Sequence, residues 1–483
     1  MIPHTSSFSS VNETFSILLS GGVLVAGAGV SGMGTAQLLN EAGVDFAVAD
    51  DNEANRAAVH EATGCRTMTT KEAAERATEY PLVVTSPGWR PDSPLLVAAQ
   101  EMDCTVIGDV ELCFLLDQNS FFGPPRDWLV VTGTNGKTTT TGMLARIMEE
   151  AGTYTGKRAA ACGNIGIAVG DALLSTPRID VLVAELSSFQ LHWSHDLTAD
   201  AGLLLNLADD HIDWHGSFGA YAEAKAKVFS YSTAVAGIDD EHVRTYVEKS
   251  GRGDIIGFTL GEPQDNQVGV VDGSIVSRIG AEPTTITRID GIEPAGTAGT
   301  LDALAATAVA VTRGATPEQI DRALHSYEVS GHRGAVVHSA DGVDWIDNSK
   351  ATNPHAADSA LRGAGDGKIV WVAGGQLKGA DVDQLVADHA SQFRAVALLG
   401  VDREEIERAV DKHAPGVRVF VTDSTDPEDA MRAVVEFAAG QARPDDAVIL
   451  APAAASLDMY SGMAQRGNIF ADAARALAGK RDV

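Results

Sequence analysis

The chain is poor in cysteine and in positive charge, and each shortage excludes a class of protein. Its 483 residues include 4 cysteines, none in a CxxC pair, which argues against a disulfide scaffold or a cysteine-based zinc site and is typical of a reducing compartment. The 36 Lys and Arg residues are outnumbered by 66 Asp and Glu, for a net charge of −30. Because such a surface repels polyphosphate, we expect binding neither to nucleic acid nor to anionic membranes.

Long apolar runs are also scarce. The one early apolar stretch, residues 15–30, is interrupted by glycines and has no basic cluster before it. It is too short and too rich in glycine to span a membrane, and we interpret it as a first buried strand. We therefore expect a cytoplasmic protein without membrane insertion.

Short apolar runs alternate with Ala-rich helical stretches along the chain. Runs of four or five apolar residues suit strands buried on both faces, and their alternation with helices predicts α/β domains with parallel sheets. At roughly 150 residues per domain, the length suggests three domains. We place them at residues 1–108 (Rossmann-like), 109–329 (a P-loop ATPase type with a mostly parallel sheet) and 330–483 (a second Rossmann-like α/β domain).

Three local signals predict individual elements within these domains. Asp272-Gly273 and Asp341-Gly342 are typical of tight β-hairpin turns, so we expect hairpins around both dipeptides. Pro317 indicates the start of a helix.

A glycine-rich turn, Gly-Ala-Gly-Val-Ser-Gly at residues 27–32, follows the predicted strand Val23–Ala26. Such a turn lets the backbone approach a phosphate at the start of a helix. The next predicted strand ends at Asp50 and Asp51, where a ribose hydroxyl could be held. The pattern favours NAD or FAD, with other nucleotides or a glycine turn without ligand as the alternatives.

A stronger phosphate-binding signal stands in the second domain, where Thr-Gly-Thr-Asn-Gly-Lys-Thr-Thr at residues 132–139 follows a predicted strand. Backbone amides of this loop would surround phosphates, Lys137 would reach the β- and γ-phosphates, and Thr138 would ligate Mg²⁺. Val131 stands where the general P-loop has glycine, so the match is partial. A chance Gly-Lys-Thr at a helix start is the alternative.

Polar side chains follow the next two predicted strands of this domain. Glu185 is suited to be a second Mg²⁺ ligand beside the P-loop. The segment 206–215 contains His211 and His215 and allows a second Mg²⁺ site, a polar loop or a zinc site, although zinc usually needs a third protein ligand. Lys225 and Lys227 follow on a predicted helix, and by themselves they are interpreted as a solvated lysine face.

The third domain places cations and a hydroxyl near the ends of its predicted strands. They are Arg333, Lys350, Lys378 and Ser456. Any one of these cations could be an ordinary surface charge. Three near strand ends in one domain of an acidic protein favour an anion-binding site, because ligands of such sheets lie at the carboxyl ends of the strands.

The order of these motifs resembles the Mur ligases, the ATP-dependent amino-acid-adding enzymes of peptidoglycan synthesis, along nearly the whole chain. The family's P-loop also lacks the first glycine, which accounts for Val131. Further similar blocks are Gly163-Asn164-Ile165-Gly166, Glu185-Leu-Ser-Ser, Asp210-His211-Ile-Asp213 and His332-Arg333. Blocks similar to the members that add D-glutamate are Ser86-Pro87-Gly88, Gly108-Asp109-Val-Glu111-Leu, Ser349-Lys350-Ala-Thr352-Asn353 and Pro452-Ala-Ala-Ala-Ser456-Leu-Asp458.

The resemblance implies ATP and two Mg²⁺ ions as cofactors and a carbamylated Lys225 in place of a solvated lysine. It implies the catalytic residues Lys137, Asn164, His211 and Lys225, and the metal ligands Thr138, Glu185, His211 and carbamylated Lys225. The implied nucleotide-binding residues are Gly133, Thr134, Asn135, Gly136, Lys137, Thr138, Thr139, Arg333, Asn348 and Lys350.

The resemblance also implies UDP-N-acetylmuramoyl-L-alanine and D-glutamate as substrates, so that the first glycine turn holds UDP and not NAD. The implied substrate-binding residues are Val30, Ser31, Asp50, Asp51, Gly88, Asn164, Ser187, Thr352, Lys378, Ser456 and Leu457. The reaction would pass through an acyl phosphate in a monomeric enzyme, with domain closure because no single domain holds the full set of residues.

The sequence departs from the family pattern at four places. The family usually has Gly-x-His-Asn where this chain has Gly296-Thr-Ala-Gly299. It usually has Asn-Ala-Leu-Ala shortly after, where this chain begins with Asp302. Asn348 replaces an Asp, Asn52 an Arg that can assist UDP binding, and Met463 an aromatic residue near D-glutamate. These changes put individual contacts in doubt and leave the phosphate, metal and carbamate residues intact.

Four other interpretations stay open from the sequence. Two are relatives, MurC and folylpolyglutamate synthetase, the second being disfavoured because it lacks a nucleotide-fold first domain. Another is an NAD-binding oxidoreductase fused to an ATPase, which rests on the first glycine turn alone. The last is a non-catalytic relative that binds cell-wall precursors, for which we would expect loss of Lys137, Glu185 or Lys225.

Overall fold

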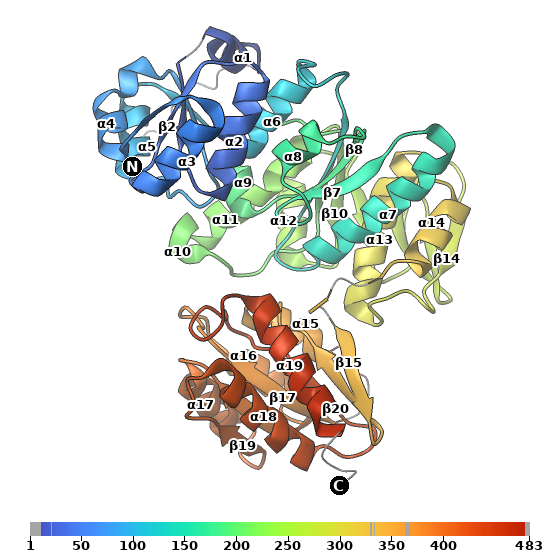
Figure 1. The fold of residues 1–483 in the computed structure, drawn as a ribbon. Coiled ribbons are helices and arrows are strands. Elements are labelled where there is room, and N and C mark those ends of the chain that lie inside the picture. Colours follow the sequence, from blue (N-terminus) through green and yellow to red (C-terminus); the bar gives the residue numbers. More distant parts are fainter. Residues whose placement is uncertain (1–10, 21, 329–330, 333, 363–367, 479–483) are drawn as a thin grey trace. The chain divides into compact units, whose positions relative to one another are not determined.

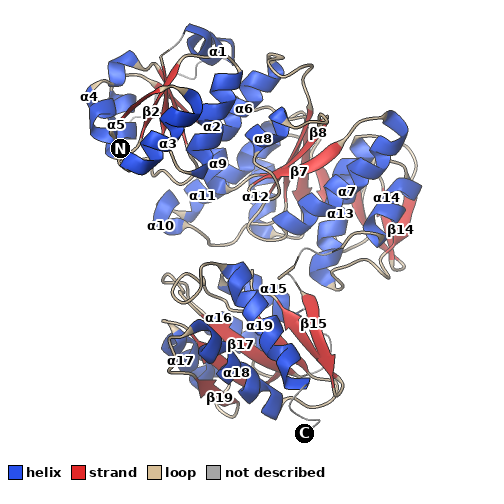
Figure 2. Cartoon of the chain, viewed as in Figure 1, coloured by secondary structure: helices blue, strands red, loops and turns tan. Residues whose placement is uncertain are grey.

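The computed structural model describes three sheets covered by helices (Figures 1 and 2). The chain divides into two compact units, residues 1–289 with 302–324, and residues 290–301 with 325–483. The first two sheets lie in the first unit and the third sheet in the second, which confirms the predicted α/β class. The exact domain boundaries stay predictions. The described residues are 11–20, 22–328, 331–332, 334–362 and 368–478.

The first sheet is parallel throughout, in the order β3-β2-β1-β4-β5. Strands β1, β2 and β4 are buried at every residue, as their short apolar runs predict. The strands are β1 Val23–Ala26, β2 Phe46–Ala49, β3 Arg66–Met68, β4 Leu82–Thr85 and β5 Thr105–Gly108. The helices are α1 Val11–Ser20, α2 Val30–Glu41, α3 Glu53–Thr63, α4 Thr70–Glu75 and α5 Pro94–Glu101.

The interpretation of residues 15–30 as one buried strand is confirmed only for Val23–Ala26, since the stretch begins in one helix and ends at Val30, the first residue of α2. Residues 15–20 belong to α1, which buries Thr14 and Leu18, one helical turn apart. The strand begins only at Val23, after Gly22 with φ of 81°, a conformation that favours glycine.

The second sheet has nine strands in the order β14-β13-β12-β11-β10-β9-β6-β8-β7. The hairpin predicted at Asp272-Gly273 is confirmed, since β12 and β13 pair antiparallel around two residues with positive φ. The strands are β6 Asp127–Thr132, β7 Ala159–Gly163, β8 Val181–Glu185, β9 Ala201–Leu204, β10 Thr233–Gly237, β11 Ile256–Phe258, β12 Gln267–Val271, β13 Ser274–Ser277 and β14 Thr284–Arg288. The helices are α6 Asp109–Gln118, α7 Lys137–Thr155, α8 Val169–Leu174, α9 Ser188–His192, α10 Ile212–His215, α11 Phe218–Ala226, α12 Glu241–Ser250, α13 Thr297–Thr312 and α14 Pro317–His325, the last starting at the predicted proline.

The third sheet has the order β15-β16-β20-β17-β18-β19 and begins with the predicted hairpin at Asp341-Gly342. Because β16, β20 and β17 are parallel neighbours, the loops that follow them meet at one edge. The strands are β15 Ala335–Ala340, β16 Val343–Asp347, β17 Ile369–Gly374, β18 Phe393–Leu399, β19 Arg418–Val421 and β20 Ala447–Leu450. The helices are α15 Pro354–Arg362, α16 Asp383–His389, α17 Arg403–His413, α18 Pro427–Gln441 and α19 Met463–Ala478.

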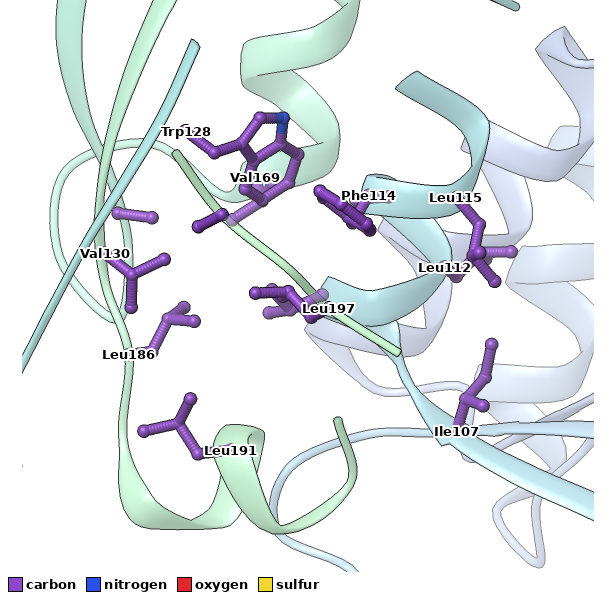
Figure 3. Close-up of a cluster of buried hydrophobic side chains, with 14 of the residues drawn as sticks. Ile107, Leu112, Phe114, Leu115, Trp128, Val130, Val169, Leu186, Leu191 and Leu197 are labelled. Atoms are coloured by element: carbon purple, nitrogen blue, oxygen red, sulfur yellow. The ribbon is translucent and has the colours of Figure 1, made fainter. Parts of the chain in front are cut away.

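The first two sheets share a continuous apolar core. One cluster of buried side chains combines residues of the first sheet with those of α6 and the second sheet (Figure 3). On the other face of the first sheet, Trp193 of the loop after α9 packs into the cluster formed by β1, β2 and β4. The two domains are therefore joined by buried apolar contacts, as expected for a single compact unit.

Two polar side chains hold the segment that makes this junction, residues 191–196 at the end of α9 and in the loop after it. The half-buried Lys227 donates through Nζ to the carbonyls of Leu191, His192 and Ser194 at 2.8–2.9 Å. On the other side, the fully buried Glu111 side chain accepts the amides of His195 and Asp196. Each side chain is thus satisfied by backbone groups of one segment, as polar groups removed from water require.

Within the described part of the chain, no helix combines the length and the apolar character needed to cross a bilayer. All four cysteines are free thiols, in agreement with the expected absence of a disulfide scaffold.

The glycine turn after β1 yields a prediction for stability. A β-carbon on Gly32 would lie 1.9 Å from the Gly27 carbonyl oxygen, whereas one on Gly34 would meet no atom within 4 Å. We expect Gly32→Ala to lower the free energy of unfolding of the first unit by about 2–4 kcal/mol, because backbone must move. Gly34→Ala in the same helix is the control and should be neutral or stabilising. Urea unfolding followed by circular dichroism measures both, and equal midpoints would contradict the close helix–strand packing.

Candidate active site

The phosphate-binding loop begins where β6 ends and leads into α7. Gly136, directly before α7, has φ of 79°, and a β-carbon there would lie 2.3 Å from Asp302 Oδ1. A β-carbon on Gly133 would lie 2.8 Å from the Leu205 side chain. Both glycines are therefore required by geometry, and the loop presents backbone at the start of a helix, where phosphates bind.

The predicted nucleotide-binding residues 133–139 lie together in this loop and the first turn of α7. Lys137 Nζ donates to the carbonyls of Gly133 and Thr134, at 2.9 and 2.7 Å. The amide of Asn135 donates to Asn206 Oδ1 at 2.8 Å, which ties the loop to the segment after β9. The lysine ammonium is thus held over the loop, in reach of a phosphate.

Glu185 links the P-loop helix to the segment after β7. The side chain is 1 % exposed. Its Oε2 accepts the Thr138 hydroxyl at 2.8 Å, and its Oε1 accepts the Asn164 amide at 2.9 Å. Two predicted residues from separate segments therefore converge on the carboxylate of a third.

Lys225 points from α11 to the same place, and the interpretation of Lys225 and Lys227 as a solvated face is wrong. Lys225 is 2 % exposed, and its Nζ donates to the Gly133 carbonyl at 2.7 Å and to Thr132 Oγ1 at 3.3 Å. Burial, and then the charge of Lys137, lower the pKa of Lys225 well below its ordinary value. A lysine in this setting is a neutral amine at a lower pH than usual, which makes it a nucleophile.

His211 stands at the start of α10 with the left-handed φ of 52°. Its ring packs on Phe189 with centroids 4.6 Å apart, and its Nε2 lies 3.5 Å from Asp210 Oδ2. Burial lowers the pKa of His211, and burial with the neighbouring His211 lowers that of His215 to about 4. Both imidazoles are therefore neutral near pH 7, so either can accept a hydrogen bond.

The donor set beside the P-loop fits Mg²⁺ better than zinc. Thr138 and Glu185 supply hard oxygen atoms, and Mg²⁺ in nucleotide sites is held by one or two such groups together with phosphates and water. Among the described residues, no group of three or more His, Cys, Asp or Glu side chains is placed to hold a metal ion. A magnesium site completed by phosphate oxygens does not need such a group.

A cavity of about 410 Å³ lies at the carboxyl end of the first sheet. Of the residues predicted to bind substrate, Val30, Ser31, Asp50 and Asp51 line it. Gly88 does not, although its neighbours Ser86 and Trp89 do. The sequence analysis missed four lining residues, Asn55, Thr70, Ser86 and Trp89, two of which flank the Pro-Gly dipeptide of a block it had singled out.

The two aspartates of this cavity also organise its walls. Asp50 accepts the amides of Ala28 and Asn52, both at 2.7 Å. Asp51 accepts the amide and hydroxyl of Thr70 at 3.0 and 2.8 Å. Asn52, where an arginine is common in the family, caps α3 by accepting two backbone amides of its first turn.

Ser187 lies two residues after Glu185 and starts α9. Its hydroxyl accepts the Gln190 amide at 3.2 Å, while the Gln190 side chain accepts the Ser187 amide at 2.9 Å. This reciprocal capping box accounts for the serine by local structure and leaves its predicted substrate contact as a prediction.

The predicted residues of the second unit gather on three loops at one edge of the third sheet. Asn348, Lys350 and Thr352 follow β16, and Lys378, in the left-handed conformation with φ of 55°, follows β17. Ser456, 4 % exposed, and the exposed Leu457 follow β20. Arg333 lies outside the described residues, while its neighbour His332 contacts Asp347 through Nδ1 at 2.6 Å.

A fully buried arginine that the sequence analysis missed connects these three loops. Arg466 of α19 donates to carbonyl oxygens of Ser349, Gly374 and Ala454, one from each loop. Burial lowers the pKa of Arg466 to about 10, so its guanidinium stays charged at neutral pH. Its position within a long helix offered no sequence signal for this role.

The structure shows what surrounds the residues at two of the departures from the family pattern, the segment 296–302 and Met463. A β-carbon on Gly299 would lie 1.6 Å from the Pro294 carbonyl oxygen, so this position accepts only glycine. Asp302 is buried against the P-loop helix and accepts the Thr140 hydroxyl at 2.9 Å. Met463, at the start of α19, is partly exposed, and its carbonyl accepts the Ser349 hydroxyl at 2.7 Å.

Family models cover most of the chain. Residues 21–108 match the "Mur ligase MurD-like, N-terminal domain", residues 131–276 the "Mur ligase middle domain" and residues 332–454 the "Mur ligase, glutamate ligase domain". These three matches agree with the three sheets.

Similar proteins extend over nearly the full length. UDP-N-acetylmuramoylalanine--D-glutamate ligase of Corynebacterium diphtheriae is 56% identical over 94% of this chain and 96% of its own. The enzymes of the same name from Corynebacterium jeikeium (47% identical, 97% of this chain and 96% of its own) and Mycobacterium avium (43%, 94% and 96%) are also similar. Two solved structures share the fold at 15% sequence identity. MurF from Acinetobacter baumannii has a TM-score of 0.60, with 96% of this chain and 98% of that chain covered. MurC from Thermotoga maritima has a TM-score of 0.53, with 95% and 99% covered.

The P-loop helix offers a matched pair of threonines for a test. Thr138→Val removes the hydroxyl that contacts Glu185, and we expect Mg²⁺-dependent nucleotide affinity to fall by roughly ten- to a hundred-fold, because a metal ligand is lost. Thr141→Val removes a buried hydroxyl that has no partner among the described residues. Its nucleotide affinity should equal that of the unchanged protein in a calorimetric titration with ADP and Mg²⁺. Equal losses in both variants would show that the Thr138 hydroxyl has no special role.

Proposed function

This chain belongs to the Mur ligase family, and we propose that it joins D-glutamate to UDP-N-acetylmuramoyl-L-alanine with conversion of ATP to ADP and phosphate, a step of peptidoglycan precursor synthesis. The observation that carries this proposal is the 56% identity to a UDP-N-acetylmuramoylalanine--D-glutamate ligase over 94% of the chain. The convergence of Thr138, Asn164 and Lys225 around Glu185 and the P-loop supports it, because a ligase must handle a phosphate and a carboxylate at one place.

The reaction begins with transfer of the γ-phosphoryl group of ATP to the L-alanyl carboxylate. The P-loop amides and Lys137 hold the β- and γ-phosphates, and Lys137 stabilises the negative charge that moves to the leaving oxygen. Thr138 and Glu185 would hold Mg²⁺, which would further neutralise the phosphate charge. Asn164, Ser187 and His211 orient the carboxylate that is phosphorylated.

The second step is attack by the neutral amine of D-glutamate on the acyl carbon. A C–N bond forms, the amine loses a proton, and phosphate leaves with the electron pair of the C–O bond that breaks. Lys378 and Thr352 hold the α-carboxylate of D-glutamate, and Ser456 and Leu457 line the place of its side chain. Arg333, Asn348 and Lys350 contact the nucleotide.

We assign carbamylated Lys225 as a ligand of a second Mg²⁺, together with His211. Support comes from the burial of Lys225 and its lowered pKa, because only a neutral amine can add to CO₂. The amine nitrogen forms a C–N bond to CO₂ and loses a proton, so a neutral amine becomes an anion and the side chain gains acceptor oxygens. The product, a carbamate, has the hard oxygen atoms that a second Mg²⁺ prefers.

In the first domain, the cavity lined by Val30, Ser31, Asp50 and Asp51 is assigned to the UDP group, with Gly88 on the path of the sugar. The enzyme is assigned as a monomer of the cytoplasm, where UDP-linked precursors and ATP are available.

Phosphate release from ATP tests the activity and the handedness of the amino acid. With Mg²⁺ and UDP-N-acetylmuramoyl-L-alanine present, we expect release that depends on D-glutamate, because the site takes its two carboxylates and amine in one arrangement. L-Glutamate is the control and should give only background release. Release that requires a different acceptor would contradict the assigned substrate while keeping the ligase family.

Replacement of the buried lysine tests the carbamate. Lys225→Ala should lower kcat by roughly a hundred- to a thousand-fold, because a charge-stabilising group is removed from a buried site. Acetate or formate should restore part of the activity by taking the place of the carbamate.

Lys249→Ala, which removes an exposed lysine stacked on Tyr246, is the control and should keep full activity in the same assay. Full activity of Lys225→Ala without added carboxylate would refute the carbamate assignment.

A further inference from the structure

The cavity at the end of the first sheet has an unusual electrostatic character for a site assigned to a diphosphate. Asp50 and Asp51 are part of its wall, and no Lys, Arg or His stands among the described residues that line it. A diphosphate carries negative charge, so it must be held here by neutral hydrogen-bond donors.

Several donors near the cavity are already engaged within the protein. The Gly27 amide donates to the Ala49 carbonyl at 2.8 Å, and the Ala28 amide donates to Asp50. The nearest arginine along α3, Arg56, donates to the Asp50 carbonyl at 2.5 Å. Asn52 is the cap of α3 and accepts hydrogen bonds, so it offers no positive charge in place of the arginine that the family resemblance implies there.

Trp89 is a side-chain donor on the wall of the cavity, in addition to the backbone amides at the start of α2. Its indole Nε1 lies 2.9 Å from the point where a β-carbon on Gly27 would stand, with Ser86 Oγ 3.7 Å from the same point. Trp89 lines the cavity, and its Nε1–H has no acceptor among the described residues of the protein. The indole ring therefore lies against the glycine turn, and its N–H is available to a ligand in the cavity.

We propose that Trp89 binds the diphosphate of the UDP-linked substrate through its indole N–H and so replaces a cationic contact with a neutral one. This inference rests on the proposed function, which assigns the cavity to UDP. The contact of Trp89 would raise the affinity for a nucleoside diphosphate relative to the affinity for the nucleoside alone. It also implies that added salt does not weaken UDP binding, because the wall has no cation to be screened and its charged side chains, Asp50 and Asp51, are anionic.

The test compares UDP with uridine, which lacks the phosphates, by isothermal titration calorimetry on the full chain. Trp89→Phe keeps an aromatic ring and removes the N–H. UDP affinity should fall by about tenfold, the usual effect of losing one hydrogen bond to a charged group, while uridine affinity stays unchanged.

Trp193→Phe is the matched control, because the buried Nε1 of Trp193 has no partner among the described residues and its loss removes no hydrogen bond. This variant should bind UDP as the unchanged protein does, and circular dichroism of each variant confirms that it folds.

The outcomes separate this inference from the proposed function. Equal UDP affinity in Trp89→Phe and the unchanged protein, or equal losses for UDP and uridine, would overturn the assignment of the N–H to the diphosphate. Absence of UDP binding to the unchanged protein would overturn the UDP site itself. A loss confined to UDP, with UDP binding to the unchanged protein that added salt does not weaken, supports the neutral contact.

Discussion

The two sheets of the first unit, each with its own helices, are held together at the short segment 191–196. Lys227 and Glu111 bind the two ends of this loop through backbone groups, and Trp193 at its centre packs into the core of the first sheet. The loop comes from the segment after Glu185, and Lys227 lies two residues after Lys225. The junction therefore fixes the cavity of the first sheet to the same elements that carry the predicted metal and carbamate residues. A substrate that reaches from one to the other then meets both ends in a defined geometry.

The chemistry of the site is built from buried polar groups in a strongly acidic protein. Glu185, Lys225 and Lys137 are all bonded to other groups of the site or to the P-loop backbone. A buried charge without such partners would be costly, so these contacts hold each group in place. The pKa of Lys225 is lowered by its burial and then by the neighbouring cation Lys137.

The departures from the family pattern are accommodated without loss of these groups. Asn52 serves as a helix cap, Gly299 allows close approach of the Pro294 carbonyl, and Asp302 binds a threonine of the P-loop helix. The cavity of the first sheet consequently presents neutral donors, and Asp302 places a carboxylate beside the nucleotide loop where the family resemblance implies an amide. Such sites recognise phosphate by the number and direction of the hydrogen bonds that the protein donates, and they do not need a positively charged side chain.

The sequence by itself determined the α/β class, the strand ends that carry the P-loop and Glu185, both hairpins and the family, because each of these depends on residues that are close together in the chain. Tertiary structure alone decided the rest. Nothing in the local pattern distinguishes Lys225 and Lys227 from a solvated lysine face, since burial of a side chain depends on elements far away in sequence. The same holds for Arg466, which joins loops after three strands, and for Trp89, whose contact with Gly27 forms only when β1 and β4 pair. Residues 15–20 formed a helix because Gly22 interrupts the apolar run, a choice that the apolar character of the run did not reveal.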